Sequence, residues 1–249
     1  MRVKDKVALV TGSGRGLGKG AAIRLAEEGA NVVVNVSRSV DEGEQVVNEI
    51  REMGRKSFCY KADVSKKTEV DTMVDNIIKE FGKIDILVNN AGVKRDNFIQ
   101  NMSEEEWDTV IDTNLKGAFN CLHAVSKHMI EQKYGKIINV SSIGHVGNIG
   151  SINYGSSKGA LITFTRCAAL ELARYNINVN CVGPGVMDAG LFTNMPQKIK
   201  DKLLKKIPLQ RVGTLRDFGN VILFLGSDES SYVTGTLIMV DAGITLGYI

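Results

Sequence analysis

The sequence has little of what marks exported, membrane-bound or metal-binding proteins. Its first residues, MRVKDKVALVTG, contain an apolar run too short for the core of a signal peptide or for a membrane span. The chain has only three His and four Cys, and none of them forms a CxxC pair or a Cys/His cluster. We therefore expect a soluble, cytoplasmic protein with reduced thiols, no metal site and no membrane partner.

An excess of charge of one sign is also missing. The chain carries 31 basic and 28 acidic residues, for a formal net charge of +3, and it has no stripe of aromatic and basic residues. This balance argues against a nucleic-acid partner. With 43% hydrophobic residues and no shift in composition, residues 1–249 are expected to form one domain with a large buried core.

Short β-branched runs alternate with longer amphipathic stretches along the whole chain. The expected strands are Val7–Thr11, Val32–Val36, Ser57–Tyr60, Ile84–Val88, Ile137–Ser141, Ile177–Cys181 and Leu237–Val240. Strands that are apolar throughout and separated by helices are typical of a parallel sheet covered on both faces. The sequence therefore predicts a doubly wound, Rossmann-type α/β fold with a seven-stranded parallel sheet, which would bind ligands at the carboxyl ends of its strands.

A glycine-rich turn follows the first expected strand and leads into a helix expected from Lys19 to Glu28. It reads TGSGRGLG, and its glycines would let the backbone turn tightly and let a pyrophosphate approach the amides at the helix start. A purely structural turn would need only one or two of these glycines. The turn therefore indicates a dinucleotide site.

The end of the second expected strand bears on the choice between NAD and NADP. NAD-binding folds place an acid there to bind the ribose 2′-hydroxyl, and NADP-binding folds place basic groups there. No carboxylate occurs before Asp41, whereas Ser37, Arg38 and the glycine-turn residue Arg15 could hold a 2′-phosphate. NADP is therefore favoured over NAD. The alternative is that the two arginines are solvated surface residues.

Polar residues also follow the third and fourth expected strands. Asp63 is placed either to accept a bond from an adenine amino group or to cap the helix that begins near Ser65, and both interpretations stay open. The run NNAG at 89–92 offers small residues for close approach of a cofactor. Asn114 lies in a helix expected over Trp107–Met129, where we expect a buried amide that organises a water.

Tyr154 and Lys158 lie four positions apart after the fifth expected strand, so a helix would place them on one face. A nearby cation stabilises a phenolate and lowers the pKa of a phenol, which makes it a usable acid or base near neutrality. The hydroxyls of Ser141 and Ser142 end the preceding strand and could hold a carbonyl oxygen for protonation. Taken alone, the pair could be two surface residues of an amphipathic helix.

Together these motifs resemble those of the short-chain dehydrogenase/reductase family. The resemblance rests on TGxxxGxG, NNAG, an asparagine in the next helix, a serine before YxxxK, and Pro184-Gly185, in this order over essentially the whole chain. The runs NLKGAFN, IPLQRVG and LFLGSDESSYVTGTLIMVDAG look most like those of the 3-oxoacyl-[acyl-carrier-protein] reductases, and they also occur in sugar, steroid and other alcohol dehydrogenases. The resemblance implies an oxidoreductase that uses NADPH, or NAD less readily, in fatty acid biosynthesis.

The resemblance also implies roles for individual residues. Tyr154 would protonate the carbonyl oxygen, and Lys158 would assist it and bind the nicotinamide ribose. Ser142 would orient the carbonyl, and Asn114 would hold a water that relays protons to Lys158. The cofactor would contact Gly12, Ser13, Arg15, Gly16, Leu17, Gly18, Ser37, Arg38, Asp63, Val64, Asn90, Ala91, Gly92, Tyr154, Lys158, Pro184, Gly185 and Val186.

Three departures from the family pattern matter. The spacing between serine and tyrosine that is usual in the family selects Ser141, whereas alignment on the end of the strand selects Ser142. We prefer Ser142, because we infer a one-residue deletion in the loop 143–150. Ala189 stands where the family usually has a threonine after Pro-Gly, so one contact to the nicotinamide carboxamide is expected to be missing. VDAG replaces the commoner VDGG near the end, which we expect to be a small packing change.

Residues 187–207 are expected to form a substrate lid. An apolar stripe consists of Leu191, Met195, Ile199 and Leu203, and the polar side carries Lys198, Lys200, Lys202, Lys205 and Lys206. This arrangement would suit an acyl chain delivered on an acidic carrier protein or on coenzyme A, and the alternative is a solvated helix face. Lys133 and Arg174 are similar in position to the basic carrier-docking residues of the family.

A helix over Gly159–Tyr175 is apolar around most of its circumference, so it needs a partner besides its own sheet. We expect a homo-oligomer, and the resemblance implies a homotetramer. The leading functional hypothesis is an NADPH-dependent ketone reductase acting on a 3-oxoacyl thioester. The alternatives are an alcohol dehydrogenase for a cyclic alcohol, sugar or steroid, and a non-catalytic protein that senses the cofactor.

Overall fold

A computed structural model describes residues 1–189, 192 and 195–248 and shows a single α/β domain. Its strands are β1 (Val7–Val10), β2 (Asn31–Val36), β3 (Ser57–Lys61), β4 (Ile86–Asn89), β5 (Gly135–Val140), β6 (Ile177–Pro184) and β7 (Leu237–Val240). They pair in parallel in the order β3-β2-β1-β4-β5-β6-β7. The predicted doubly wound sheet is confirmed. Because the strand order reverses between β1 and β4, the crevice of such a fold opens at the carboxyl ends of these two strands.

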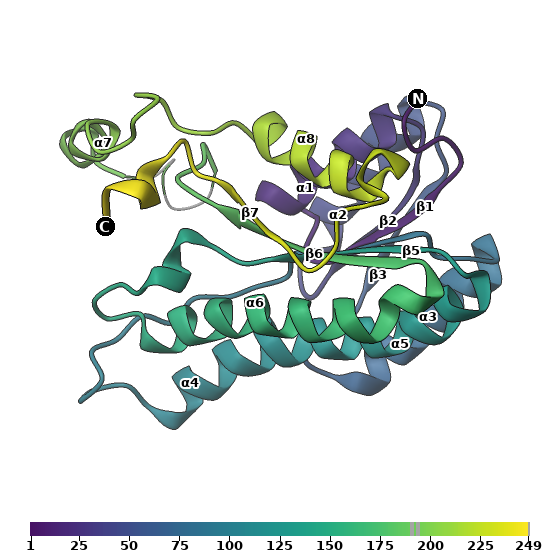
Figure 1. Cartoon of the computed structure of the whole chain (residues 1–249), viewed down its shortest axis with the longest axis horizontal. Coiled ribbons are helices and arrows are strands. Elements are labelled where there is room, and N and C mark those ends of the chain that lie inside the picture. Colours follow the sequence, from purple (N-terminus) through teal and green to yellow (C-terminus); the bar gives the residue numbers. More distant parts are fainter. Residues whose placement is uncertain (190–191, 193–194, 249) are drawn as a thin grey trace.

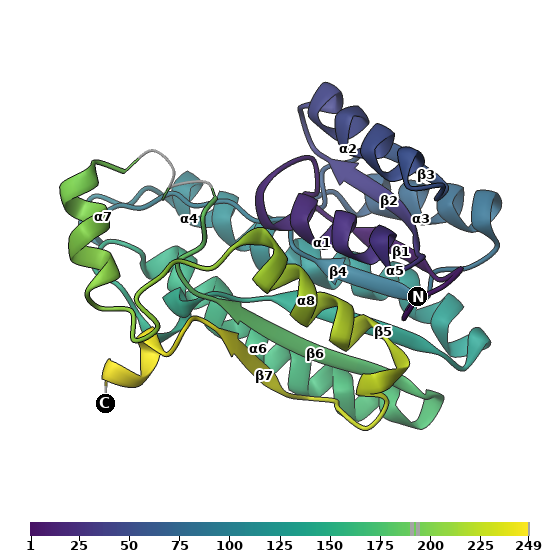
Figure 2. The same ribbon diagram turned by 90° about the horizontal axis from the view of Figure 1, so that it is seen from above.

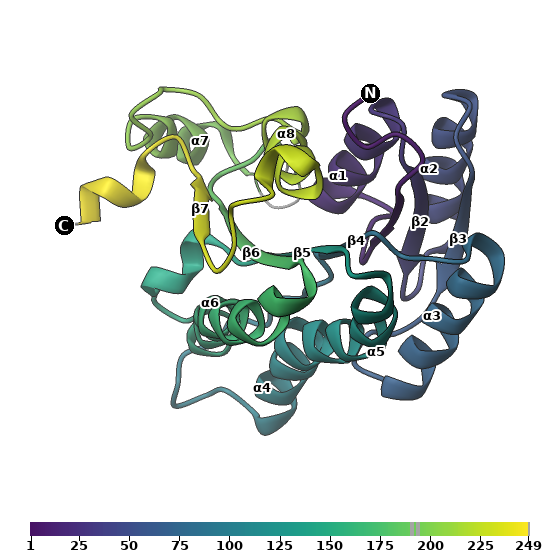
Figure 3. The same cartoon turned by 45° about the vertical axis from the view of Figure 1, so that its right-hand side comes forward.

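Helices cover both faces of the sheet (Figures 1 and 3). One layer holds α1 (Gly16–Glu27), α2 (Val40–Glu52) and α8 (Leu215–Gly226), and the other holds α3 (Lys67–Phe81), α4 (Glu104–Ile111), α5 (Gly117–Gln132) and α6 (Ile152–Leu172). Successive residues of a strand point to opposite faces, so Val10 joins the core beneath α1 and α8, whereas Leu9 joins the core over α5. These two buried cores hold the carboxyl ends of the strands in place.

Several elements differ in their bounds from the sequence-based expectation, and two of these differences bear on the site. β6 continues three residues beyond the expected end, because Cys181–Pro184 pair with Leu237–Val240 of β7. The helix expected over Trp107–Met129 consists of α4 and α5 joined by a π-helical turn, Asp112–Lys116. Such single π turns occur frequently at functional sites, and this one contains Asn114.

A short helix, α7 (Gln197–Leu204), stands beyond the carboxyl ends of the strands and lies away from the two helical layers (Figures 1 and 2). It covers part of the segment predicted to be a lid. The remaining short helical turns are Ile143–Val146, Ala173–Tyr175, Asp228–Ser230 and Ile244–Tyr248. Within the described ranges, no helix has the length and apolar character needed to cross a membrane.

Candidate active site and cofactor cleft

Tyr154 and Lys158 lie in the first turns of α6, as the spacing predicts. The Lys158 side chain is only 4% exposed, and its Nζ donates a 2.7 Å hydrogen bond to Val140 O at the end of β5. The same Nζ lies 5.7 Å from the centroid of the Tyr154 ring. The fold therefore brings a phenol and an ammonium together at the carboxyl end of a central strand.

Lys158 carries its charge in an unfavourable environment. Burial lowers its pKa from 10.5 to about 8, and the nearby Cys181 opposes this shift only in part. In the part of the chain that the structure describes, Val140 O is its one hydrogen-bond acceptor, and no carboxylate is paired with it. Any negative charge that develops nearby, including that of a phenolate, therefore stabilises this buried ammonium and is stabilised by it.

The structure separates the roles of the two adjacent serines. Ser141 is 2% exposed, and its Oγ donates a 2.7 Å bond to Lys158 O, so it fastens α6 to β5. Ser142 is partly exposed, and its Oγ accepts a 3.0 Å bond from Gly144 N. A Cβ atom on Gly144 would lie 3.0 Å from Tyr154 Cε1 and 3.4 Å from Ser142 Oγ. Ser142, rather than Ser141, therefore has its hydroxyl beside the tyrosine ring.

Asn114 is buried in the π turn and binds the segment that follows β4. Its Oδ1 accepts a 2.8 Å bond from Val93 N, and its Nδ2 donates to Val93 O at 3.1 Å and to Ser157 Oγ at 3.0 Å. A Cβ atom on Gly92 would lie 3.3 Å from Asn114 Oδ1 and 3.5 Å from Lys158 Nζ. Asn114 and Lys158 thus border the same glycine, although the amide itself is used to hold the chain.

The glycine turn has the conformation that close approach of a phosphate needs. Gly12 and Gly16 have φ values of +61° and +57°, which side chains rarely adopt. A Cβ on Gly16 would meet nothing within 4 Å, so space lies open there, and α1 begins at this residue. Within the described residues, Arg15 at the N-cap supplies no side-chain cap for the first amides of α1. These open N–H groups and this space fit the pyrophosphate of a dinucleotide.

Asn90 and Thr11 hold the glycine turn against β4. Asn90 Nδ2 donates to Thr11 O at 2.9 Å and to Gly12 O at 3.1 Å, and Thr11 Oγ1 accepts from both Asn90 N and Ala91 N at 3.0 Å. Gly18 is needed because a Cβ there would lie 2.4 Å from Gly12 O. The predicted residues 11, 12, 18, 90 and 91 therefore meet at one place, between the ends of β1 and β4.

One supporting residue of this turn was not anticipated from the sequence. Asn35, buried in β2, accepts a bond from Gly12 N at 3.2 Å and donates to Ala62 O at 3.0 Å. The available signal was an amide inside the apolar run Asn31–Val36. Ser13, expected among the cofactor contacts, is fully buried, and its Oγ donates to Val10 O at 2.7 Å. Its hydroxyl therefore stabilises the turn.

The residues expected to select NADP lie at the surface near the ends of β1 and β2. Ser37 and Arg38 are exposed, and the Arg15 side chain is 82% exposed. Glu42, in the first turn of α2, lies 3.7 Å from Arg15, a contact that sequence spacing did not reveal. A carboxylate and a guanidinium thus lie together near the end of β2, where the sequence predicts the binding of the 2′-substituent.

Asp63 forms the turn that leads toward α3. Its Oδ1 accepts bonds from Ser65 N at 3.0 Å and from Ser65 Oγ at 2.8 Å. Val64 is buried, and its carbonyl accepts a 2.9 Å bond from Asn120. The helix cap expected of Asp63 is not observed, because α3 begins at Lys67 and has no side-chain cap. Asp63 Oδ2 has no hydrogen bond among the described residues, and its contact to adenine stays a prediction.

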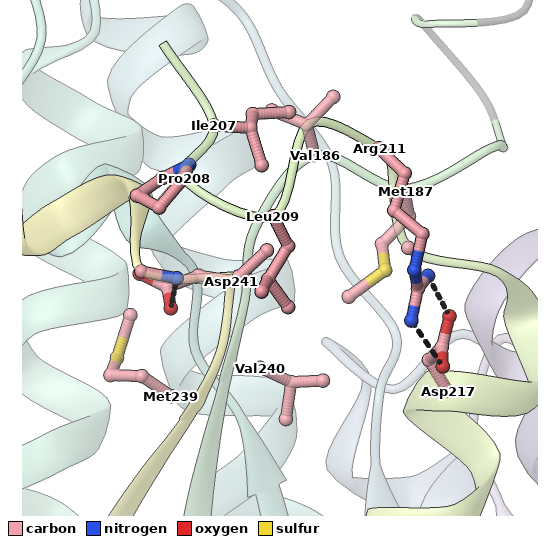
Figure 4. Close-up of a pocket in the computed structure, with 13 residues that line it drawn as sticks. Val186, Met187, Ile207, Pro208, Leu209, Arg211, Asp217, Met239, Val240 and Asp241 are labelled. Carbon is pink, nitrogen blue, oxygen red and sulfur yellow. Dashed lines mark hydrogen bonds and ion pairs between the residues drawn. The ribbon is translucent and has the colours of Figure 1, made fainter. Parts of the chain in front are cut away.

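Pro184 and Gly185 end β6, and Val186 and Met187 enter the wall of a cavity of about 590 Å³ (Figure 4). Its other walls come from Ile207, Pro208, Leu209 and the residues after β7, so it is largely apolar. Arg211 pairs with Asp217 at 2.7 Å on one side of it. Met187 and Ile207, the two ends of the segment expected to be a lid, line this cavity, whereas Leu191 of the same segment lies outside the described residues.

Comparisons with known proteins identify the family of this chain. The family described as short chain dehydrogenase matches residues 6–200. The 3-oxoacyl-[acyl-carrier-protein] reductase FabG of Staphylococcus epidermidis is 46% identical over 96% of this chain and 99% of its own length. The (2S)-[(R)-hydroxy(phenyl)methyl]succinyl-CoA dehydrogenase subunit BbsD of Thauera aromatica is 41% identical over 99% of both chains.

A solved structure is also similar throughout. A chain from Sinorhizobium meliloti assigned to the short-chain alcohol dehydrogenases superposes with a TM-score of 0.93 at 35% identity, covering 98% of this chain and 97% of its own. The chain therefore belongs to the short-chain dehydrogenase/reductase family, most like the 3-oxoacyl-[acyl-carrier-protein] reductases, and is an NAD(P)-dependent oxidoreductase.

Proposed function

We propose that the protein reduces the 3-oxo group of an acyl thioester to a secondary alcohol with NADPH. The observation that carries this proposal is the cluster of Tyr154, Ser142 and Lys158 at the end of β5, beside the cleft that fits a dinucleotide. The thioester is supported by the 46% identical relative described as a 3-oxoacyl-[acyl-carrier-protein] reductase.

The chain's own residues account for the proton chemistry of this reaction. The bound nicotinamide supplies the hydride to the carbonyl carbon. Ser142 Oγ donates a hydrogen bond to the carbonyl oxygen and orients it, and Tyr154 transfers its hydroxyl proton to that oxygen. Lys158 stabilises the phenolate that remains. Asn114 holds the segment at Gly92 against Lys158, where a water would return the proton.

Carrier-bound and coenzyme A thioesters are both compatible with the lid. The side chains of Lys198, Lys202, Lys205 and Lys206 are exposed on or just after α7, where they can attract a phosphate or an acidic carrier protein. Oxidation of a cyclic alcohol, sugar or steroid, or reduction of the corresponding ketone, is the second candidate, favoured by the 35% identical structure assigned to the alcohol dehydrogenases.

A homotetramer is part of the proposed function. Leu170 of α6 is 83% exposed, Phe119 of α5 is 47% exposed, and Trp107 of α4 is 36% exposed. These three helices form one outer layer of the domain (Figure 1). Large apolar side chains on a shared outer face support burial against a second copy. Light scattering after gel filtration distinguishes a tetramer from a monomer.

The function is tested with acetoacetyl thioesters of N-acetylcysteamine and of a carrier protein, next to a panel of cyclic ketones. NADPH oxidation with the thioesters, well above that with NADH, is the expected result. Activity confined to a cyclic ketone or to its alcohol would establish the second candidate. A preference for NADH would contradict the cofactor assignment but not the family.

The two serines are expected to behave differently. Ser142→Ala should lower kcat about 10² to 10³-fold, because one donor to the carbonyl oxygen is lost. Ser141→Ala should lower the free energy of unfolding by about 1 kcal/mol, because Lys158 O loses its partner, and should change kcat much less. Steady-state kinetics and urea unfolding of both variants check this pair; equal effects on kcat would contradict the assignment.

Glu42 is expected to weaken the preference for NADPH. Glu42→Gln should raise the ratio of kcat/KM for NADPH over NADH by about two- to fivefold, because an exposed carboxylate near a 2′-phosphate is removed. Arg15→Gln should lower the ratio by about tenfold. Glu49→Gln is the matched control, since Glu49 also lies on α2 and pairs with Lys19 at 2.7 Å. A control effect as large as that of Glu42→Gln would contradict this prediction.

A further inference from the structure

The segment that follows NNAG is fastened at three points around Tyr154. Val93 is held by Asn114 through both its N–H and its carbonyl. Arg95 O accepts a 2.7 Å bond from Asn153 Nδ2, on the residue before Tyr154. Asn97 N donates a 2.8 Å bond to Gly150 O, just before α6. The backbone of residues 93–97 is therefore fixed relative to the tyrosine.

This attachment places a second ammonium at the tyrosine. Lys94 Nζ lies 5.5 Å from the centroid of the Tyr154 ring, about as near as the Nζ of the buried Lys158. The Lys94 side chain is 33% exposed, so it can be reached from solvent. Its partner is Asp96, at 2.5 Å, whose side chain is 42% exposed.

We propose that Lys94 recognises a carboxylate carried by the substrate close to the reacting ketone. In the free enzyme Asp96 occupies the position that the substrate's carboxylate takes. The inference rests on the proposed function and narrows its substrate class to oxo compounds with an acidic group a few bonds from the carbonyl.

The charges around Tyr154 favour this assignment. Lys158 is buried and already bonded to Val140 O, so a substrate substituent has little access to it. His145 lies in the short helical turn after β5, and its Nδ1 is engaged with Ser142 O at 2.7 Å. Lys94 is thus the accessible cation at the tyrosine within the part of the chain described here.

Replacing the carboxylate of Asp96 at Lys94 with that of the substrate costs little free energy. An exposed lysine–aspartate pair contributes little to stability, so Asp96 can leave Lys94 without a large loss of free energy. When a substrate is already bound at Tyr154 and Ser142 through its ketone, its carboxylate loses much less entropy on binding to Lys94 than a free anion does. Charge recognition is therefore effective for a substrate that carries both groups.

Two pairs of compounds test the proposal, each an acid and its methyl ester. The first pair is the N-acetylcysteamine thioester of 3-oxoadipate, and the second is 4-oxopentanoate, which has the same spacing of ketone and carboxylate without a thioester. Dissociation constants are measured by calorimetry on the full-length enzyme saturated with NADP⁺. We expect the acid to bind about tenfold more tightly than the ester in at least one pair.

Substitutions then assign the preference to one side chain. Lys94→Gln should bring the ratio of ester to acid dissociation constants close to one, Lys94→Arg should retain most of it, and Asp96→Asn should raise it about two- to fivefold. Lys67→Gln removes another lysine that is paired with an aspartate, Asp71 on α3, and should leave the ratio unchanged.

The outcomes separate the two proposals. No preference for the acid in either pair, or a preference that survives Lys94→Gln, overturns the role of Lys94. A preference that depends on Lys94 and is seen with 4-oxopentanoate supports that role even if the enzyme turns over no thioester, in which case only the proposed thioester function fails.

Discussion

Tyr154→Phe is expected to lower turnover by at least about 10³-fold while the affinity for the cofactor stays within about twofold. The substitution removes one oxygen atom and leaves the ring in its place between Lys158 and Gly144. Without the hydroxyl, the carbonyl oxygen has no proton donor as the hydride arrives. The residues of the glycine turn in the candidate cofactor cleft, among them Thr11, Gly12 and Asn90, are unchanged in this variant.

The measurement compares kcat with the dissociation constant of NADPH, obtained from its fluorescence on binding. Tyr175→Phe serves as the control, because Tyr175 follows α6 at its other end. Loss of turnover with intact NADPH binding identifies an enzyme with Tyr154 as its acid. If the variant retained most of its turnover, the proton would have to come from another group, and the proposed mechanism would be wrong.

Local patterns were sufficient to predict that the strands form and that Tyr154 lies beside Lys158. Tyr154 and Lys158 meet because helical spacing alone puts them on one face, and no distant residue is needed to know it. The glycine turn was predictable for a similar reason, since glycine readily adopts the positive φ values that Gly12 and Gly16 have in the structure. β7 was predicted with its observed bounds, because its apolar run ends at Asp241.

Contacts between distant segments were not predictable from the sequence. Asn35 lies in β2, yet its side chain bonds to Gly12 after β1 and to Ala62 after β3. Glu42 reaches Arg15 only because α2 packs beside the glycine turn. Lys94 reaches the Tyr154 ring because residues 93–97 are fastened to α6. In each case the tertiary fold, rather than spacing along the chain, sets the distance.

The π turn at Asn114 also could not be predicted from the sequence, although it is a local feature of the chain. The sequence indicates one continuous helix over Trp107–Met129, because nothing in its periodicity marks an extra residue in a turn. The three hydrogen bonds of Asn114 to Val93 and Ser157 account for the interruption, since they favour an amide turned inward. The sequence shows an asparagine in an otherwise apolar helix, but it does not indicate which residues that asparagine binds.

Replacing Lys158 with methionine is expected to abolish turnover and, below about pH 8, to stabilise the fold. Turnover should fall by about 10³-fold or more, because the phenolate of Tyr154 loses its adjacent cation. Stability should rise because Lys158 is held in a buried site that lowers its pKa from 10.5 to about 8. The gain at neutral pH should be on the order of 1 to 2 kcal/mol, since loss of the bond to Val140 O offsets part of the desolvation that is relieved.

The sign of the pH dependence distinguishes this explanation from a general packing effect. Between about pH 8 and pH 10.5 the folded wild-type protein has released the Lys158 proton, whereas the unfolded chain still binds it. The Lys158 contribution to the free energy of unfolding therefore rises with pH across this window, and Lys158→Met lacks the rise. The difference in stability between variant and wild type should shrink toward pH 10.5.

Urea unfolding of both proteins across this pH range measures the difference directly. Lys136→Met is the matched control, because burial also lowers the pKa of Lys136, which lies in β5 and bonds to Asn178 Oδ1 at 2.7 Å. It should show the same sign of pH dependence with turnover nearly unchanged, because Lys136 is at the opposite end of β5 from Val140. If the stability difference for Lys158→Met stayed constant with pH, burial would not destabilise the charged form of Lys158. The stabilisation of a phenolate by Lys158 would then need another explanation.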